Sequence, residues 1–390
     1  MNDDKIELPK DSPNGRVETQ YFNFDSLLLE SSEILSPVTI AYETYGKLNE
    51  KKDNAILLCH ALSGDAHLAG ISKEDGKLGW WEFMIGPGRA FDTDKYFIIG
   101  SNVLGGCKGS TGPSSVNPVT NKPYGSDFPE ITIRDMVNAQ VKLIENMGIQ
   151  KLFSIAGGSM GGMQVIEWTY SHPEKVATAI PIATTFHHSA QQIAFNEVGR
   201  ISIMNDPDWS GGDYYDKKPP VNGLSIARMI GHITYMSDDS MKEKFGRRTR
   251  SAGKDGKKLN TGFEVESYLR YQGEAFVKRF DANTYICVTK AIDFFDAGDN
   301  KDLIKHYYDT DIKFLVISYS HDWIYPPYQS KEIVKVLKFA QADVTYCDIS
   351  KSYGHDAFLI PHEEQGLLIG NFLNNNYNKY ISSVRSNIKQ

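Results

Sequence analysis

The chain has 390 residues, of which 41% are hydrophobic and 23% charged, and its formal net charge is −7. This length and apolar content suit one large globular domain with room for a smaller inserted one. The acidic balance argues against a nucleic-acid partner, because nucleic-acid surfaces concentrate Lys and Arg. The single cationic stretch, residues 244–258, is interrupted by Gly and Ser, which indicates a solvated loop.

Neither a membrane segment nor a secretory signal is indicated by the sequence. No run approaches the ~18 apolar residues of a membrane span, and the amino-terminal segment MNDDKIELPKDSPNG is acidic and polar. Cys59, Cys107, Cys287 and Cys347 are widely spaced without a CxxC pair. They therefore indicate neither a metal site nor a disulfide framework. We predict a soluble, cytoplasmic protein without metal and without a membrane partner.

The first half of the chain alternates between strand and helix patterns. Residues 16–43 mix alternation with β-branched residues and predict two antiparallel strands. Continuous apolar runs, typical of strands buried on both faces, follow at 55–59, 96–101, 152–156 and 177–183. Helical patterns at 133–147 and 160–170 lie between them. This alternation predicts a mostly parallel sheet with helices on both sides.

The pattern changes after Thr185. Residues 187–295 show helical patterns and a polar loop, and the strand–helix alternation resumes at residue 312 with strands at 312–319 and 344–349. Helices are predicted at 328–339 and 363–373. We therefore predict an α/β fold of the α/β-hydrolase type, with a core domain formed by residues 1–185 and 300–390. Residues 186–299 are predicted to form an inserted helical lid.

A candidate nucleophile lies in the segment Gly157-Gly158-Ser159-Met160-Gly161, which contains the pattern GxSxG. Chance alone produces this pattern in about one chain in ten of this length. Here it follows an apolar strand and opens a helix, as a nucleophile elbow requires. We predict that Ser159 is the catalytic nucleophile. The alternative is a glycine-rich turn that contains a buried, unreactive serine.

The base should be a histidine that follows the acid in the chain, because this fold uses the order serine, acid, histidine. His355 lies in a loop just after the predicted strand 344–349, from which an imidazole can reach Ser159. We predict His355 as the base, and a solvent-exposed loop histidine is the alternative. The other histidines weighed for this role are His187, His188, His232, His306, His321 and His362.

The acid should lie at the carboxyl edge of the sheet. Asp322 directly follows the strand pattern at 313–318, whereas Asp311 precedes that strand and Asp348 lies inside the next one. We predict that Asp322 fixes the tautomer of His355 and favours the imidazolium ion. The alternative is an Asp that caps a helix or closes a turn.

An oxyanion hole needs two backbone N–H groups aimed at the developing charge. One is predicted from Met160, directly after the nucleophile, and the second from Leu62, in the loop that follows the strand 55–59. His60 precedes the nucleophile in the chain, so a structural role is expected for it.

These residues predict acyl transfer to water or to another hydroxyl, and composition does not decide between the two. Several longer segments, however, resemble the homoserine O-acetyltransferase family. They are AYETYG (41–46), NAILLCHALSGDAH (54–67), GWWEFMIGPG (79–88), GSNVLGGCKGSTGPSSVNP (100–118), GGSMGGMQ (157–164) and FEVESYLRYQGEAFVKRFDANTY (263–285). The run at 100–118 is specific to this transferase group.

The resemblance implies an acyltransferase of methionine biosynthesis that works in two steps. Ser159 would take the acyl group from acetyl-CoA, the co-substrate, with His355 as base, and L-homoserine would then remove it. No bound cofactor is implied. The resemblance also implies a homodimer formed through the helical lid.

The same resemblance implies a pocket for the amino acid. Arg228 would bind the homoserine carboxylate, to which a guanidinium can donate two hydrogen bonds. Asp356 would bind the ammonium group, and Tyr235 is a further candidate on the same helical stretch as Arg228. The alternatives are a surface arginine on a helix and an aspartate that caps the helix that follows.

Other functions are compatible with the same triad. They are homoserine O-succinyltransferase or serine O-acyltransferase of this family, an esterase or thioesterase, and a non-catalytic binding protein on this scaffold. A hydrolase would cleave acyl-CoA or aryl esters without an acceptor. A binding protein of this kind usually loses a triad residue, and all three are present here.

Overall fold

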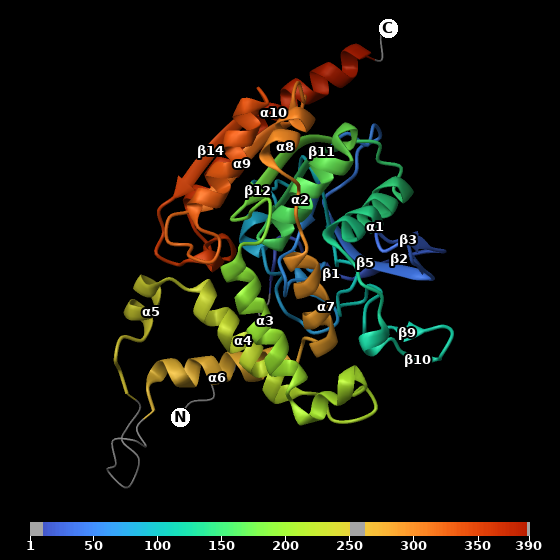
Figure 1. Cartoon of the computed structure of the whole chain (residues 1–390). Helices are drawn as coiled ribbons and strands as arrows, with labels where there is room; N and C mark the ends of the chain where they lie inside the picture. The colour runs from blue at the N-terminus through green and yellow to red at the C-terminus, as the bar shows by residue number, and fades with distance from the viewer. Residues whose placement is uncertain (1–10, 250–261, 388–390) are drawn as a thin grey trace.

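A computed structural model describes residues 11–249 and 262–387. Its centre is an eight-stranded sheet in the order β14-β13-β12-β11-β6-β8-β5-β2 (Figure 1). The strands are β2 (Gln20–Phe24), β5 (Val38–Tyr45), β6 (Ala55–Cys59), β8 (Phe97–Ser101), β11 (Leu152–Gly158), β12 (Val176–Ile182), β13 (Lys313–Tyr319) and β14 (Asp343–Ile349). Neighbours from β8 to β14 are parallel, whereas β5 and β2 pair antiparallel at the other edge. This arrangement confirms the predicted mostly parallel α/β sheet.

The central strands are continuous apolar runs because both of their faces are covered. Every residue of β6 and of β11 is buried. Leu57 of β6 packs with α1 (Ile133–Asn146), α2 (Met160–Ser171) and α9 (Pro327–Phe339) on one face. Its neighbours Ile56 and Leu58 point to the other face, where α10 (Glu363–Asn387) packs. Successive side chains of a strand alternate between faces, so two helical layers require apolar residues at every position.

Between β12 and β13 the described residues form helices and no strand of two or more residues. These helices are α3 (Ala190–Met204), α4 (Val221–Tyr235), α5 (Asp238–Lys244), α6 (Glu264–Val277), α7 (Ala282–Asp293) and α8 (Asn300–Tyr307). In Figure 1, α3, α4 and α6 lie together beyond one end of the sheet. They share a separate apolar cluster that includes Ile203, Leu224 and Phe276. Helix α7, by contrast, also contributes Val288 and Ile292 to the main core.

Shorter elements complete the chain. They are β1 (Arg16–Val17), β3 (Leu27–Leu28), β4 (Ile34–Leu35), β7 (Ile71–Ser72), β9 (Val116–Asn117), β10 (Lys122–Pro123) and 3-10 turns at Glu82–Met84, Gly125–Asp127, Pro173–Lys175, Pro207–Gly212 and His355–Leu359. Helix α10 extends well beyond the predicted end at residue 373. In the predicted cationic loop, α5 ends at Lys244, and residues 250–258 lie outside the described part. No helix within the described ranges has the length and apolar character to cross a membrane.

Candidate active site

Ser159 occupies a sharp turn between β11 and α2, with φ 58° and ψ −123°. This backbone conformation is unusual for a residue with a side chain and is often found at functional sites. The turn is possible because its neighbours are small: a Cβ on Gly161 would lie 2.2 Å from the Cys59 carbonyl oxygen, and one on Gly157 would lie 2.6 Å from Gly161. The GxSxG pattern thus corresponds to a strained elbow that presents Ser159 at the end of the sheet.

His355 and Asp322 form a buried pair. The distance from His355 Nδ1 to Asp322 Oδ2 is 2.6 Å, and both side chains are 5% exposed or less. Asp322 Oδ1 accepts hydrogen bonds from the N–H groups of Ile324 (3.1 Å) and Tyr325 (2.8 Å), which fix the carboxylate. Because the carboxylate accepts a hydrogen bond from Nδ1–H, the neutral His355 ring carries its hydrogen on Nδ1. Its Nε2 is then free to accept a proton.

The pKa of His355 results from opposing effects. Burial, the largest single effect, lowers the pKa, but the charge and hydrogen bond of Asp322, with a further contribution from Asp356, raise it above its usual value. A raised pKa makes the imidazole a stronger base toward a serine hydroxyl. It also means that the ring gains its proton at a higher pH than an ordinary histidine.

The end of α4 contacts both loops that carry this pair. Trp323, next to Asp322, donates its indole hydrogen to the Met236 carbonyl oxygen at 3.0 Å. The Ser237 hydroxyl donates to the Ser352 carbonyl oxygen. Gly354 has φ 84°, and a Cβ there would lie 2.6 Å from the Ser237 backbone nitrogen. The glycine before His355 is therefore required both by its backbone conformation and by the close approach of the helical insertion.

The predicted oxyanion donors lie at the same place. Met160 is the first residue of α2, so its N–H has no carbonyl partner inside the helix. Leu62 lines the cavity next to Ser159. The loop before it is shaped by buried His60, whose Nδ1 lies 2.7 Å from the Ala61 carbonyl oxygen and whose Nε2 accepts from the Val103 N–H at 3.0 Å. Both His60 nitrogens are thus occupied by backbone groups, as a structural role requires.

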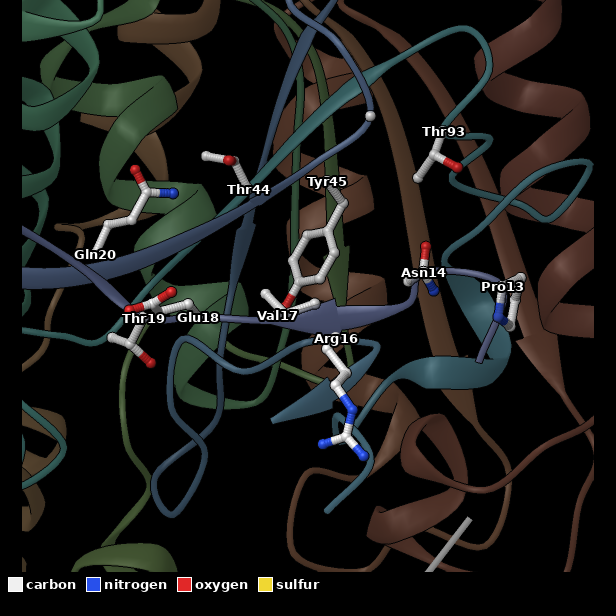
Figure 2. Close-up of a pocket in the computed structure, with 11 residues that line it drawn as sticks. Pro13, Asn14, Arg16, Val17, Glu18, Thr19, Gln20, Thr44, Tyr45 and Thr93 are labelled. Atoms are coloured by element: carbon white, nitrogen blue, oxygen red, sulfur yellow. The ribbon is translucent and has the colours of Figure 1, made fainter. Parts of the chain in front are cut away.

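A small cavity of about 50 Å³ lies against Ser159 and His355. Tyr235 and Tyr325 are part of its wall, as are three polar residues that were not predicted as site residues: His188, Gln192 and Asn196. A larger cavity of about 530 Å³ lies elsewhere, between residues 13–20 and strand β5 (Figure 2). Its lining contains none of the predicted site residues, so cavity size alone does not locate the chemistry.

Arg228 on α4 lies close to the loop that carries Leu62. Its guanidinium carbon is 4.7 Å from the ring centre of Phe276 and 5.7 Å from that of Tyr235, and Nη1 is 3.4 Å from the Ser63 hydroxyl. These contacts leave N–H groups of the Arg228 guanidinium available to donate to a ligand. A second arginine that sequence analysis missed, Arg279, donates to the Ser63 carbonyl oxygen at 2.9 Å.

Asp356 and Tyr235 lie beside the triad as well. The ring centres of Tyr235 and His355 are 5.9 Å apart. Burial raises the pKa of the Asp356 carboxyl, while the charges of His355 and Arg228 partly counteract that effect. Of the three predicted substrate-binding residues, Tyr235 lines the cavity at Ser159. Arg228 contacts the Tyr235 ring, and Asp356 directly follows His355 in the chain.

The alternative histidines have partners other than Asp322. His188 pairs with Asp293, His232 with Tyr268, His321 with Asp239, and His306 packs on Tyr170, while His362 lies near Gln365 and His187 near Thr185. Of this group, only His188 lines the cavity at Ser159. Within the described ranges, no group of three or more His, Cys, Asp and Glu residues is placed to hold a metal ion.

Comparison with known proteins gives first the class and then the family. A family model described as the alpha/beta hydrolase fold matches residues 54–360, which confirms the predicted fold class. A structure of esterase E22 superposes with a TM-score of 0.83 at 30% identity, covering 92% of this chain and 100% of the esterase. A structure of homoserine O-acetyltransferase from Bacillus anthracis superposes with a TM-score of 0.81 at 26% identity, covering 93% and 97%.

Curated relatives are more similar in sequence. The homoserine O-acetyltransferase of Methanohalobium evestigatum is 57% identical over 364 residues, which cover 93% of this chain and 74% of that protein. The homoserine O-acetyltransferase of Leptospira biflexa is 55% identical over 373 residues, covering 94% and 98%. The chain therefore belongs to the homoserine O-acetyltransferase family.

Proposed function

We propose that this protein transfers an acetyl group from acetyl-CoA to the hydroxyl of L-homoserine. The observation that carries this proposal is that a cation and an anion, Arg228 and Asp356, lie next to the set of Ser159, Asp322 and His355: Arg228 contacts Tyr235, which packs near His355, and Asp356 follows His355 in the chain. Homoserine carries an ammonium and a carboxylate, so it requires one anion and one cation from its site. A plain esterase needs neither. Since acetyl-CoA and homoserine are intracellular metabolites, we place the reaction in the cytoplasm.

In the first half-reaction, the Ser159 oxygen attacks the thioester carbon of acetyl-CoA while His355 Nε2 takes the serine proton. The N–H groups of Leu62 and Met160 hold the oxyanion of the tetrahedral intermediate. The carbon–sulfur bond then breaks, the imidazolium returns its proton to the CoA sulfur, and an acetyl-serine remains. Asp322 stabilises the imidazolium throughout this step.

In the second half-reaction, His355 removes the hydroxyl proton of homoserine as its oxygen attacks the acetyl-serine carbonyl. The bond to Ser159 breaks, the serine oxygen recovers a proton from the imidazolium, and O-acetylhomoserine leaves. We assign the homoserine carboxylate to Arg228, the ammonium to Asp356, and a packing contact to Tyr235. The reaction needs no bound cofactor or metal.

We further propose that residues 186–299 form a lid over a core of residues 1–185 and 300–390. The separate apolar cluster of α3, α4 and α6 supports this division, as do the contacts of the α4 end with both triad loops. A lid that excludes water protects the acetyl-serine from hydrolysis. The homodimer through this lid remains our proposal, and the exposed apolar side chains Val198, Ile201, Ile226 and Ile233 on α3 and α4 support it.

The decisive experiment measures CoA release from acetyl-CoA and from succinyl-CoA, with and without L-homoserine or L-serine. We expect sustained release only with acetyl-CoA and homoserine, as the names of the homoserine O-acetyltransferases that this chain matches imply. Preference for succinyl-CoA or for serine would reassign the substrate within the family. Equal release without any acceptor would identify a thioesterase and contradict the proposal.

A further inference from the structure

We propose that Tyr325, anchored by His188 and Asp293, is a positioning residue that orients the His355 ring for its work at Ser159. This inference rests on the proposed role of Ser159 and His355 as nucleophile and base. A second histidine–aspartate pair, which lies beside the triad and has no part in the mechanism above, provides the anchor.

The second pair is built on the helical insertion. His188 Nδ1 lies 2.9 Å from Asp293 Oδ1, and Asp293 Oδ2 forms an ion pair with Arg200 Nη1 at 2.7 Å. Asn196 donates to Asp293 Oδ1 at 2.7 Å. The side chains of His188, Asp293 and Arg200 are each 8% exposed or less. His188 lies just before α3, Arg200 lies on α3, and Asp293 is the last residue of α7. Because α3 and α7 pack against each other, they hold the pair in place.

The charges in this cluster determine the direction of its hydrogen bonds. Arg200 balances the Asp293 carboxylate, which can only accept, so His188 must carry its hydrogen on Nδ1. Burial has the largest effect on the pKa of His188 and lowers it, although the charge and hydrogen bond of Asp293 raise it. A lowered pKa favours the neutral ring, in which Nε2 carries no hydrogen. The Tyr325 hydroxyl lies 2.5 Å from that nitrogen and must be the donor.

Tyr325 contacts two members of the triad, Asp322 and His355, each through a different group. Its backbone N–H donates to Asp322 Oδ1 at 2.8 Å. Its ring stacks on the His355 ring, with centres 4.8 Å apart and planes inclined by 22°. Burial raises the pKa of Tyr325, so its hydroxyl, which lies in the wall of the cavity that also contains Ser159, keeps its proton. A single residue thus contacts both Asp322 and His355, and the bond to His188 prevents its ring from rotating away.

The hydrogen-bond direction assigns a role to the hydroxyl. The Tyr325 hydroxyl donates its hydrogen to His188, so it anchors the ring that stacks on His355 and does not act as a base. Small errors in the position of a catalytic group cost large factors in rate. Loss of this anchor should consequently slow attack by Ser159 without changing the affinity for homoserine.

The test compares Tyr325→Phe, His188→Leu and His188→Gln with a matched control, Tyr307→Phe. Tyr307 is another buried tyrosine, and its hydroxyl is bonded to Thr169 in the main core. The readouts are the rate at which a fluorophosphonate labels Ser159, the kcat and KM for homoserine, and the melting temperature. Labelling needs no acceptor, so it reports on activation of Ser159 by the positioned His355 even if the proposed acceptor is wrong.

We expect Tyr325→Phe and His188→Leu each to reduce labelling and kcat by about tenfold, with the KM for homoserine within about twofold of the wild type. His188→Gln, whose amide can accept from Tyr325 and donate to Asp293, should restore most of the rate. Because both residues act through one hydrogen bond, the double variant Tyr325→Phe/His188→Leu should be no slower than the slower single variant. Tyr307→Phe should lower the melting temperature without slowing labelling.

Two results would overturn the inference. One is a Tyr325→Phe enzyme that labels and turns over as fast as the wild type. The other is a double variant whose losses multiply, which would show that the two side chains act independently. If instead the wild-type enzyme labels normally but lacks homoserine-dependent CoA release, the proposed function fails while the positioning inference stands.

Discussion

The sheet core and the helical insertion contribute different side chains to the surroundings of Ser159. Ser159, Asp322 and His355 follow three strands of the same sheet, β11, β13 and β14. Arg228, Tyr235 and the Asp293 partner of His188 instead lie on α4 and α7 of the insertion. In the proposed mechanism the core supplies the triad, which any acyl transfer needs, together with Asp356, whereas the insertion supplies Arg228, the cation expected to bind the carboxylate of the acceptor. Changes in the triad should therefore stop every acyl transfer, whereas a change of Arg228 should affect the acceptor alone.

The largest effect is expected from removal of the nucleophile in the core. Ser159→Ala removes the group that carries the acetyl intermediate in the proposed scheme, so we expect kcat to fall by about 10⁴-fold or more. Mass spectrometry after incubation with acetyl-CoA should show an acetylated wild-type enzyme and an unmodified variant. A variant that still accumulates acetyl groups at wild-type rate would place the nucleophile elsewhere.

The next largest effect concerns the core acid. Asp322→Asn keeps the shape of the side chain but removes the charge that orients His355, and we expect a loss of about 10³–10⁴-fold in kcat. In the wild type, the raised pKa of His355 means that kcat/KM for acetyl-CoA should fall as pH drops through a value above 6.5. The base must be neutral, so activity is lost on the acid side. Asp322→Asn should shift the acid-side fall of kcat/KM to lower pH. If the fall stays at the same pH in this variant, it reports the titration of a group other than His355.

An intermediate effect is expected in the insertion. Arg228→Ala should raise the KM for homoserine by about 10- to 100-fold, because a charged hydrogen bond contributes about 1.5–3 kcal/mol. Formation of the acetyl-enzyme should continue near the wild-type rate. Arg270→Ala is the matched control, since Arg270 on α6 is exposed and pairs only weakly with Glu266. If Arg228→Ala slowed acetyl-enzyme formation as much as it raised the KM for homoserine, Arg228 would not act on the acceptor alone, and the proposed division of roles between core and insertion would be wrong.

The smallest effect is expected at the contact between the two regions. Gly354→Ala forces a Cβ against the Ser237 backbone at a residue with positive φ, and we expect a loss of about 1–3 kcal/mol in stability. Urea unfolding measures this change. Gly298→Ala is the control, because Gly298 also has positive φ but a Cβ added there would meet no atom within 4 Å. A larger loss for Gly298→Ala would mean that the interregional contact is unimportant.

Much of this organisation was predictable from local sequence. Buried parallel strands need apolar residues at every position, so the runs at 55–59 and 152–156 were recognisable without any partner. The elbow at Ser159 was recognisable because a strand, a sharp turn and a helix follow one another within a few residues, and such a turn requires small neighbours. Asp322 and His355 were placed by the rule that carboxyl ends of parallel strands meet at one edge.

Other features depend on contacts between residues far apart in the chain. His188 and Tyr325 are 137 positions apart, and their hydrogen bond has no local pattern that could predict it. The sequence offered His188 only as an alternative base. Arg279 was missed because its contact is with a backbone carbonyl 216 positions away. Such pairings are specified by how the helices of the insertion pack, not by spacing.

The sequence by itself therefore determined the α/β class, the order of strands and helices along the chain, and the three residues expected to carry the reaction. Each of these depends on periodicity or on short segments whose physical requirements are local. Tertiary structure decided which second histidine lines the cavity at Ser159, how the α4 end contacts both triad loops, and which arginines lie next to the Leu62 loop. Those outcomes depend on packing of the insertion against the sheet, where burial and close approach select partners that no local pattern encodes.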